Sequence, residues 1–317
     1  MDISPKIRRL VMIGACYVDT ILSVPKFPQE DHKLRATTLE RRRGGNVANT
    51  LEVLQQFRSL DEIELVLLCV LPAKSSEGTK LVKDSFGERV DTDHCIYRES
   101  HHEPASSYII KADDCGSRTI VNFNELPEME FGEFKEKIAK LDDKRTWFHF
   151  EGREVDTSIQ CLKWLKQEYP DCTRSVEVEK PNRPGLDKMA EEADIVFFSK
   201  TWAEAAGYSD AGALLKEQAK LLGNASLLCC TWGAKGATVL TTADGSLHSA
   251  QSSPEPESKV VDTIGAGDTF TAGILGSILA PDAAGPIQDR AKVAVDFANR
   301  LAGRKVLQVG FSNLISD

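Results

Sequence analysis

The stretch Val260–Phe270 (VVDTIGAGDTF) places a carboxylate, Asp268, just after two glycines, where a strand-like run gives way to a helical one. Phe270, Ile274 and Ile278 recur at every fourth residue, which predicts a helix with one apolar face. Backbone N–H groups at the start of a helix bind anions, and glycines let a phosphate approach closely. A carboxylate there would repel a static phosphate, but it is well placed to take a proton from a hydroxyl that attacks a phosphoryl group.

The same pattern has a bland explanation, because an aspartate at a helix N-terminus interacts favourably with the helix dipole by about 0.3–1 kcal/mol. Other glycine-loop chemistries fit less well. The phosphate loop GxxxxGK[ST] is absent, and Gly265 and Gly267 lack the third glycine of a dinucleotide-binding loop. The length and specificity of DTxGAGDTF therefore favour chemistry at Asp268.

A second motif, RGGNVAN at residues 43–49, has glycines that allow a tight entry into a helix. Asn46 and Asn49 are three residues apart and are expected on one face of that helix, near its start. Carboxamides both donate and accept hydrogen bonds, which suits them to sugar hydroxyls. Asn46 could also serve only as the N-cap of the helix.

Together, the two motifs resemble the signatures of the ribokinase-like sugar kinases, the PfkB family. The resemblance covers Gly14 to Phe311 and implies an ATP-dependent kinase with Asp268 as general base. It also implies an anion hole formed by the N–H groups of Gly265, Ala266 and Gly267. The sugar-binding residues that it implies are Asp19, Asp31, Gly45, Asn46 and Asn49.

Three of the implied residues also have ordinary explanations. We expect Asp19 at the end of the first strand, at the sheet edge where α/β proteins bind ligands, and Asp31 in a nearby loop. Either could be a plain turn residue. Arg118 lies on an expected lid strand, from which it could reach over the phosphoryl group, or it could simply be an exposed strand arginine.

Two segments in the middle of the chain, FHFEGR at 148–153 and SVEVEKP at 175–181, are similar to the ketohexokinase branch of the family. The resemblance thus implies transfer of the ATP γ-phosphate to a primary hydroxyl of a ketohexose such as fructose. Kinases for ribose, adenosine or another polyol remain alternatives. A non-catalytic sugar or nucleotide sensor with the same fold is an alternative from another class.

Glu177 and Glu179 alternate with valines on an expected buried strand, so both should point to one face. Buried charges are costly unless they meet cations or hydrogen-bond donors. A Mg²⁺–phosphate cleft would supply those partners, and so would Lys200 or Arg153. The two glutamates are therefore candidate metal ligands, with structural ion pairs as the alternative.

On the nucleotide side, the Asn-x-x-Glu motif of many family members is missing, and Ser199-Lys200 stands in its place, as in the ketohexokinase branch. This leaves the metal ligands open. The turn Thr231–Gly236 resembles the family's T-x-G-x-x-G turn. The resemblance implies ATP-binding roles for Lys200, Thr231, Gly233, Gly236, Gly265, Gly267, Asn299 and Ala302. It further implies ATP and Mg²⁺ as cofactors, and in many members activation by K⁺ and dimerisation through the lid.

The elements that must position these residues alternate between strands and helices, which predicts a mainly parallel sheet flanked by helices. The expected strands are Leu10–Ile13, Ile63–Val70, Trp147–Phe150, Arg174–Val178, Asp194–Phe198 and Ser226–Cys230, and the expected helices include Val47–Phe57, Thr157–Glu168 and Ala211–Leu222. Residues 20–42 and 93–124 carry short strands without helices, such as Ser107–Lys111 and Arg118–Phe123, and are predicted to form a discontinuous β lid. Residues 1–19, 43–92 and 125–317 then form the large α/β domain.

Composition agrees with a globular enzyme, since 41% of the 317 residues are hydrophobic and 27% are charged. The net charge of −9 argues against a nucleic-acid partner, and the sequence has no apolar run long enough to cross a membrane. The eight cysteines show no spacing typical of zinc sites or disulfides, which predicts reduced thiols and a cytoplasmic protein.

Overall fold

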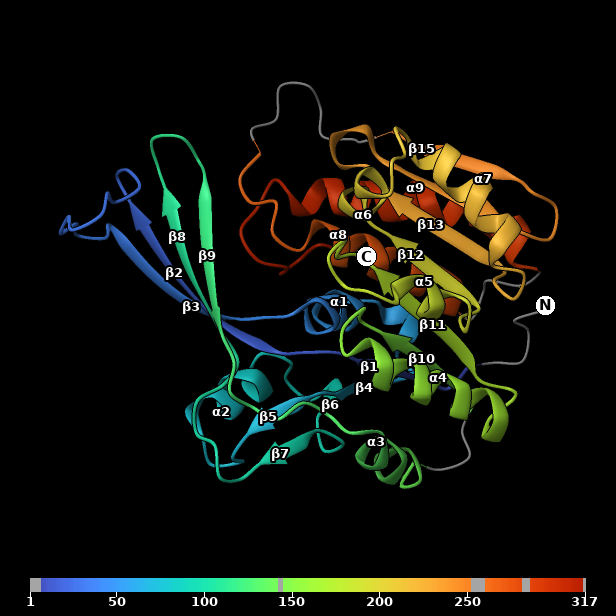
Figure 1. Cartoon of the computed structure of the whole chain (residues 1–317), viewed down its shortest axis with the longest axis horizontal. Coiled ribbons are helices and arrows are strands. Elements are labelled where there is room, and N and C mark those ends of the chain that lie inside the picture. Colours follow the sequence, from blue (N-terminus) through green and yellow to red (C-terminus); the bar gives the residue numbers. More distant parts are fainter. Residues whose placement is uncertain (1–6, 142–144, 252–259, 281–285, 316–317) are drawn as a thin grey trace.

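The computed structural model describes residues 7–141, 145–251, 260–280 and 286–315. A nine-stranded sheet forms its centre, with the strand order β15-β14-β13-β12-β11-β10-β1-β4-β6 (Figure 1). All neighbours from β13 to β6 are parallel, whereas β14 and β15 are antiparallel. The strands are β1 (Arg9–Ile13), β4 (Glu64–Leu68), β6 (Val90–Asp91), β10 (Thr146–Phe150), β11 (Thr173–Val178), β12 (Ile195–Phe198), β13 (Leu227–Thr231), β14 (Ala237–Thr241) and β15 (Leu247–Ala250).

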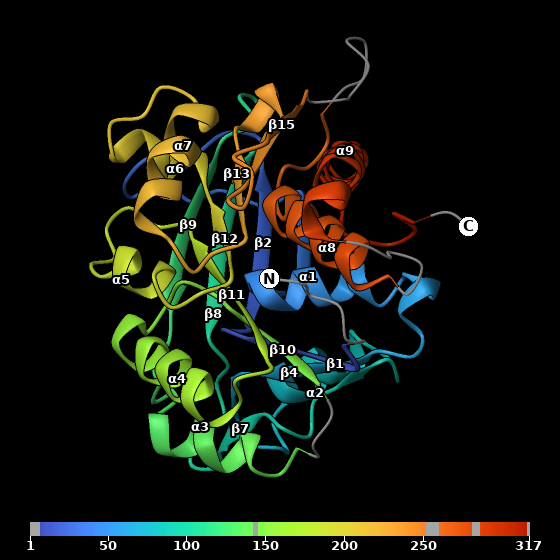
Figure 2. The ribbon, with the colours of Figure 1, turned by 90° about the vertical axis from the view of Figure 1, so that its right-hand side faces the viewer.

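Successive side chains of the central strands point to opposite faces and so build two separate cores. Leu10 and Met12 belong to one core, and Val11 and Ile13 to the other. Figure 2 shows the sheet edge-on, with helices on both sides. One face is covered by α1 (Asn46–Leu54), α8 (Ala266–Leu279) and α9 (Ile287–Lys305), and the other by α3 (Phe131–Ile138), α4 (Val155–Glu168), α5 (Leu186–Ala190), α6 (Lys200–Ala205) and α7 (Ala211–Leu221).

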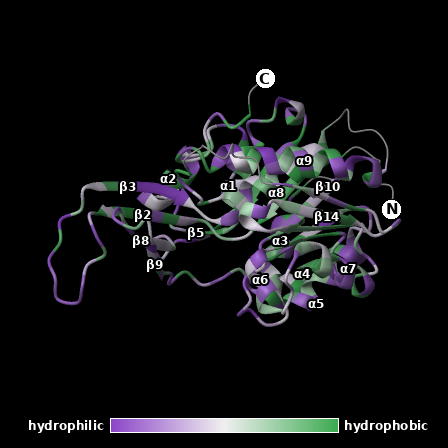
Figure 3. Ribbon diagram, turned by 90° about the horizontal axis from the view of Figure 1, so that it is seen from above, coloured by the Kyte–Doolittle hydropathy of each residue, from purple (hydrophilic) through white to green (hydrophobic). Residues whose placement is uncertain are grey.

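A four-stranded sheet with the order β3-β2-β8-β9 projects from the side of the large sheet (Figures 1 and 3). Its strands are β2 (Tyr17–Val24), β3 (Thr38–Gly44), β8 (Ser106–Ala112) and β9 (Arg118–Phe123). Every residue of β9 is exposed, and Leu39, Ile120 and Val121 are apolar residues that are more than half exposed. This sheet therefore has an uncovered apolar surface, and we call it the lid sheet.

Smaller elements connect these parts of the chain. Two short parallel strands pair beside the lid sheet, next to one helix. They are β5 (Val70–Pro72) and β7 (Ile96–Arg98), the helix is α2 (Glu77–Asp84), and single 3₁₀ turns occupy η1 (Arg58–Leu60) and η2 (Gly233–Lys235). Among the described residues, no helix combines the length and apolar character needed to cross a membrane.

The predicted fold class, a mainly parallel sheet flanked by helices with a small additional β part, is confirmed. Two details were wrong. The expected strand at 63–70 is two strands, β4 and β5, separated at Cys69, and the expected helix at 47–57 ends at Leu54. The division into a large domain and a lid at 20–42 and 93–124 stays a prediction. The lid sheet itself runs from Tyr17 to Gly44 and from Ser106 to Phe123, and β7 lies outside it.

Candidate active site

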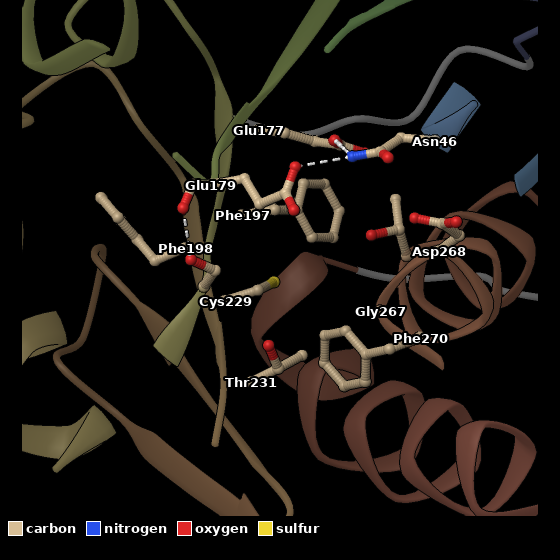
Figure 4. A pocket seen from close by; sticks show the side chains of 12 residues that line it. Asn46, Glu177, Glu179, Phe197, Phe198, Cys229, Thr231, Gly267, Asp268 and Phe270 are labelled. Carbon is tan, nitrogen blue, oxygen red and sulfur yellow. Dashed lines mark hydrogen bonds between the residues drawn. The ribbon is translucent and has the colours of Figure 1, made fainter. Parts of the chain in front are cut away.

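An open pocket of about 520 Å³ lies where β11, β12 and β13 end and where α1 and α8 begin (Figure 4). Parallel strands and helix N-termini meet at this edge, which is where open α/β sheets bind ligands. The lining residues are Asn46, Glu177, Glu179, Phe197, Phe198, Ser199, Cys229, Thr231, Gly267, Asp268, Phe270 and Thr271. Figure 4 shows the Glu177 and Glu179 carboxylates near the Asn46 amide, with the Phe197 ring beside Glu179 and the Phe270 ring farther down in the view.

The N-terminus of α8 opens into this pocket because of the glycine that precedes it. Gly265 is the N-cap residue and has a φ of 77°, and a Cβ on it would lie 2.2 Å from the Phe311 ring. Only glycine fits this position without strain. Because glycine has no side chain to cap the helix, no side chain occupies the first N–H groups of α8, although the Ala266 N–H donates to the backbone oxygen of Thr263 at 3.4 Å. The anion hole at Gly265, Ala266 and Gly267 stays a prediction.

Asp268 lies in the first turn of α8 and lines the pocket. Its Oδ2 accepts a hydrogen bond of 2.7 Å from the Asn49 amide, and its backbone oxygen accepts one from the Thr50 hydroxyl. Burial and the nearby Glu177 raise the pKa of Asp268 well above its usual value, and the Asn49 hydrogen bond lowers it. A carboxyl group with a raised pKa is a better proton acceptor than an ordinary aspartate.

Arg43, at the end of β3, holds Asn49 in place. Its Nη1 donates to Asn49 Oδ1 at 2.8 Å, its Nε donates to Ser85, and its Nη2 pairs with Glu52. The side chain is almost fully buried, and this burial lowers the Arg43 pKa to about 10. An arginine at that pKa is still charged at neutral pH, so a fixed cation supports the amide that contacts Asp268.

Asn46 brings the two candidate metal ligands together. Its Nδ2 donates to Glu177 Oε2 and to Glu179 Oε2, each at 2.9 Å (Figure 4). The predicted alternative that Asn46 caps α1 is wrong, because Gly45 is the N-cap residue. Burial, with a contribution from Glu179, raises the pKa of Glu177 to about 7, against the lowering effect of the Asn46 hydrogen bond.

The two glutamates do not use the partners that the sequence suggested. Arg153 instead pairs with Glu128 and donates to the Tyr17 hydroxyl, and Lys200 pairs with Glu204 at 3.5 Å. In the described part of the chain, no cluster of three or more acidic, histidine or cysteine side chains could hold a metal by itself. Two carboxylates that line this pocket do fit Mg²⁺, because it is commonly held by one or two carboxylates, water and substrate phosphates.

Asp19 lies in β2 of the lid sheet, two residues after its start, and not at the end of the first strand as predicted. Strand β1 ends at Ile13, and the next strand along the chain, β2, already belongs to the lid sheet. Asp19 is buried against Gly44, where a Cβ would lie 2.5 Å from its carboxylate. Burial raises its pKa, whereas Ser107 and two arginines lower it.

Asp31, unlike Asp19, lies on the surface of the protein. Asp31 is exposed, has a φ of 62°, and lies in the connection between β2 and β3, which projects from the lid sheet (Figure 3). It does not line the pocket. Gly45, with a φ of 104°, packs so closely on the Ala15 oxygen that a Cβ would lie 2.1 Å from it. The sugar-side residues are thus divided between the tightly packed start of α1 and an exposed lid loop.

Of the residues predicted to bind ATP, Thr231 and Gly267 line the pocket. Gly233 and Gly236 form the turn after β13, both with positive φ. Asn299 is buried in α9 and donates to the backbone oxygen of Gln251, next to the end of β15.

Two further residues of that prediction have other contacts. Ala302 packs against the core on the α9 side of the sheet. The Lys200 side chain is 46% exposed, and it does not line the pocket.

Arg118 reaches from lid strand β9 to the loop before α8. Its Nη2 donates to Thr263 Oγ1 at 3.0 Å, and its Nη1 lies 3.9 Å from Asp262 Oδ1. Arg42 of β3 also pairs with Asp262, at 3.5 Å. Two lid strands therefore contact the loop that leads into the predicted anion hole.

Sequence reasoning missed several residues of the site. Arg43 entered the prediction only as the first residue of the RGGNVAN motif, and Arg42 did not enter it. In the structure, Arg43 is buried and Arg42 pairs with Asp262. Glu151, in FHFEGR, is buried and accepts from the Ala15 N–H at 2.9 Å. A charged residue directly after an apolar strand run was the available signal for Glu151, and no comparable signal marked the arginines.

Comparison with known proteins places this fold and site in a family. Residues 7–317 match the pfkB family carbohydrate kinases. Ketohexokinase from Mus musculus is 30% identical over 319 residues, an alignment that covers 97% of this chain and 99% of that protein. The chain therefore belongs to the pfkB family, and it is an ATP-dependent carbohydrate kinase.

Solved structures agree with this fold. Ribokinase from Arabidopsis thaliana, complexed with ribose and ATP, has a TM-score of 0.77 and 18% identity, with coverage of 98% of this chain and 96% of that one. Ribokinase from Giardia lamblia has a TM-score of 0.76 and 18% identity over the same shares of the two chains. At 18% identity, the likeness to these two structures is evidence for the fold alone and not for the activity or the substrate.

Proposed function

We propose that this kinase transfers the γ-phosphate of ATP to a primary hydroxyl of a ketohexose such as fructose, with Asp268 as general base. The observation that carries the proposal is the Asp268 carboxylate, which lines the pocket at the open N-terminus of α8 and is held by Asn49. The similarity to mouse ketohexokinase supports the sugar class. Kinases for ribose, adenosine or another polyol remain the alternatives.

In the proposed reaction, Asp268 accepts the proton of the sugar hydroxyl as the hydroxyl oxygen bonds to the γ-phosphorus. The bond between that phosphorus and the bridging oxygen breaks, and ADP leaves with the bond's electron pair. The N–H groups of Gly265, Ala266 and Gly267 offset charge on the transferred group, as phosphoryl transfer requires. General-base assistance of this kind is worth roughly 10²–10⁴-fold in rate.

Glu177 and Glu179 would hold Mg²⁺ together with the ATP phosphates, and the ion would neutralise charge on those phosphates. On the sugar side, Asp19, Gly45, Asn46 and Asn49 are the proposed contacts, with Asp31 contributed by the lid loop. Thr231, Gly233, Gly236, Asn299, Ala302 and Lys200 remain the proposed nucleotide-side residues, with Arg118 above the phosphoryl group. Lid closure would exclude water, the competing nucleophile.

Three further properties belong to the proposal. A homodimer through the lid sheet is supported by its exposed apolar residues, Leu39, Ile120 and Val121. Activation by K⁺ and a cytoplasmic location follow from the family resemblance and from the unpaired cysteines.

One assay tests the proposed function. ADP release is measured with ATP and Mg²⁺ over ketoses, aldoses, polyols and nucleosides, for the wild-type protein and for Asp268→Asn. We expect the highest kcat/KM with a ketohexose, and a loss of about 10²–10⁴-fold in kcat in the variant, with ATP affinity retained in calorimetry. A preference for ribose or adenosine would replace the substrate class, and no sugar-dependent ADP would favour a sensor. Near-normal turnover by Asp268→Asn would refute the base.

A further inference from the structure

Behind Glu177, a chain of hydrogen bonds connects three buried side chains of β10 and β11 to the pocket. Trp147 Nε1 lies 2.8 Å from Ser175 Oγ, Ser175 Oγ lies 2.8 Å from His149 Nδ1, and His149 Nε2 lies 3.2 Å from Glu177 Oε1. Trp147, Ser175 and His149 have no measurable exposure. The reaction described above uses none of these three residues.

The pleat of the two strands explains why these side chains meet. Side chains two residues apart on a strand point to the same face, so Trp147 and His149 lie beside Ser175 and Glu177. His149 and Ser175 are direct register partners on the parallel strands. The His149 ring also packs edge-on against Phe197, which lines the pocket. The chain of hydrogen bonds therefore runs along the sheet from its core to the pocket wall.

Elementary hydrogen-bond chemistry determines which atoms carry the protons in this series of hydrogen bonds. An indole N–H can only donate, so Ser175 Oγ accepts from Trp147. The Ser175 hydroxyl has no further partner among the described residues, so its own proton goes to His149 Nδ1. Because Nδ1 accepts from Ser175, the ring proton of His149 lies on Nε2, which faces Glu177 Oε1 at 3.2 Å.

The opposite tautomer fits less well. A proton on Nδ1 would leave the Ser175 hydroxyl without an acceptor, and it would set a bare Nε2 against Glu177 Oε1 in the ionised form of Glu177 that metal binding requires. A buried polar group without a partner is unfavourable. The Nε2–H tautomer instead gives each Glu177 oxygen a donor, His149 for Oε1 and Asn46 for Oε2.

We propose that His149 is a positioning residue, oriented by Ser175 and Trp147, that holds the Glu177 carboxylate in the one orientation that binds the metal–nucleotide complex. This inference rests on the metal-binding role proposed for Glu177. Hydrogen bonds to metal ligands from surrounding residues fix ligand orientation, and losing them typically costs 10–100-fold in metal affinity. Mg²⁺ is sensitive to such a loss because it demands near-ideal octahedral geometry.

Binding of Mn²⁺ with ADP, followed by electron paramagnetic resonance of free Mn²⁺, tests the inference without turnover. His149→Leu removes the donor, and we expect metal affinity to fall about 10–100-fold. His149→Gln can place an amide N–H near Nε2, and we expect it to restore affinity to within a few-fold of wild type. Unchanged affinity in His149→Leu, or no rescue by His149→Gln, would overturn the proposal.

Glu177→Gln separates the two levels of the argument. If this variant binds Mn²⁺ and ADP as well as wild type, the proposed metal role of Glu177 fails, and the role of His149 fails with it. If Glu177→Gln weakens binding while a folded His149→Leu does not, only the positioning role fails. The panel assay on Asp268→Asn is independent of both results, because it tests the base.

The tautomer of the His149 ring can also be observed directly, in the wild-type protein. The chain has six histidines, and ¹⁵N labelling of their rings gives a separate spectrum for each. The His149 signals, assigned by their loss in His149→Gln, are expected to be those of a neutral Nε2–H ring. In Ser175→Ala, which removes the hydroxyl donor, we expect the Nδ1 signal to move and the metal affinity to fall. A neutral Nδ1–H ring in wild type would overturn the proposal.

Discussion

Asn49 and Asp268 are 219 positions apart in the chain, yet the Asn49 amide donates a 2.7 Å hydrogen bond to the Asp268 carboxylate. The other end of the same amide accepts from Arg43 at 2.8 Å. Because arginine has no acceptor, the amide must turn its oxygen to Arg43 and its NH₂ group to Asp268. The orientation of the proposed base is thus set by a buried cation at the end of a lid strand.

The first prediction concerns the pH dependence of activity. A base must be ionised to work, so kcat/KM rises with pH through the pKa of Asp268, which burial places well above the usual value. Asn49 stabilises the ionised form, so Asn49→Leu should raise that pKa and move the acid limb to higher pH. Glu177 disfavours the ionised form, so Glu177→Gln should move the limb to lower pH. The pH profile of kcat/KM measures both shifts.

Thr50→Val is the matched control for this experiment. Thr50 donates to the backbone oxygen of Asp268 and not to the carboxylate, so we expect no displacement of the acid limb. An acid limb that stays in place in Asn49→Leu, or that moves in the same direction in Asn49→Leu and Glu177→Gln, would contradict the assignment of Asp268 as base.

The second prediction concerns the stability that Arg43 provides. Arg43→Met removes the cation and leaves Glu52, Asn49 and Ser85 without their partner. Breaking one side of a buried ion pair typically costs about 3–5 kcal/mol, and Glu52 is 23% exposed, which favours the lower end of that range. Urea unfolding measures the loss. Arg41→Met, on the same strand but exposed, should change the free energy of unfolding by less than about 0.5 kcal/mol.

A double variant refines this test. If the penalty comes from the unpaired Glu52, then Arg43→Met with Glu52→Gln should be less destabilised than the sum of the two single variants. Strictly additive effects would show that the ion pair does not cause the loss.

The third prediction concerns the glycine before α8. Gly265→Ala introduces two faults, a Cβ only 2.2 Å from the Phe311 ring and a side chain at a φ of 77°. We expect lower stability and weaker binding of ADP, because the N–H groups of the predicted anion hole must shift. Phe311→Leu should restore part of the loss, since it relieves the contact but not the backbone strain. Gly132→Ala, at a helix position with no atom within 4 Å of the new Cβ, should be neutral or slightly stabilising.

The fold could be predicted because buried parallel strands are continuous apolar runs that alternate with amphipathic helices. The candidate catalytic motif was equally visible, because Asp268 and its glycines are adjacent in the chain. The contact between Asn49 and Asp268 could not be predicted, since it depends on how α1 packs on α8. Arg43 was missed for a related reason: only its tertiary partners show that this arginine is buried.

Other residues show that a sequence motif does not determine which sheet a residue joins or which side chains it contacts. His149 stands in an apolar run, where a buried histidine and a functional one look alike, and only its contacts separate the two. Asp19 and Asp31 both belong to segments beyond β1, where short strands gave no indication of which sheet they would join. Lys200 begins α6, and its side chain pairs with Glu204 on its own helix.

The last prediction concerns Arg118, which connects the lid sheet to the loop before α8. Arg118 donates to Thr263 and lies near Asp262, so it can act as a latch that holds the lid sheet against this loop. Its second possible role is a direct contact with the transferred phosphoryl group. Arg118→Met removes both. A hydrogen bond to a charged group is worth about 1.5–3 kcal/mol, so loss of the phosphoryl contact should lower kcat by about 10- to 100-fold. Steady-state kinetics with the sugar and ATP varied in turn measures this.

Thr263→Val separates the two tasks, because it removes the hydrogen-bond partner of the latch, leaves only the 3.9 Å contact with Asp262, and keeps the guanidinium in place. If Arg118 contacts the phosphoryl group during transfer, Thr263→Val should keep kcat within a few-fold of wild type while Arg118→Met loses it. If Arg118 is only a latch, both variants should raise the sugar KM by a similar factor and leave kcat nearly unchanged. The first outcome is the expected one, because a guanidinium on an exposed strand, held by a neutral hydroxyl and by a carboxylate 3.9 Å away, can turn to a phosphate at little cost.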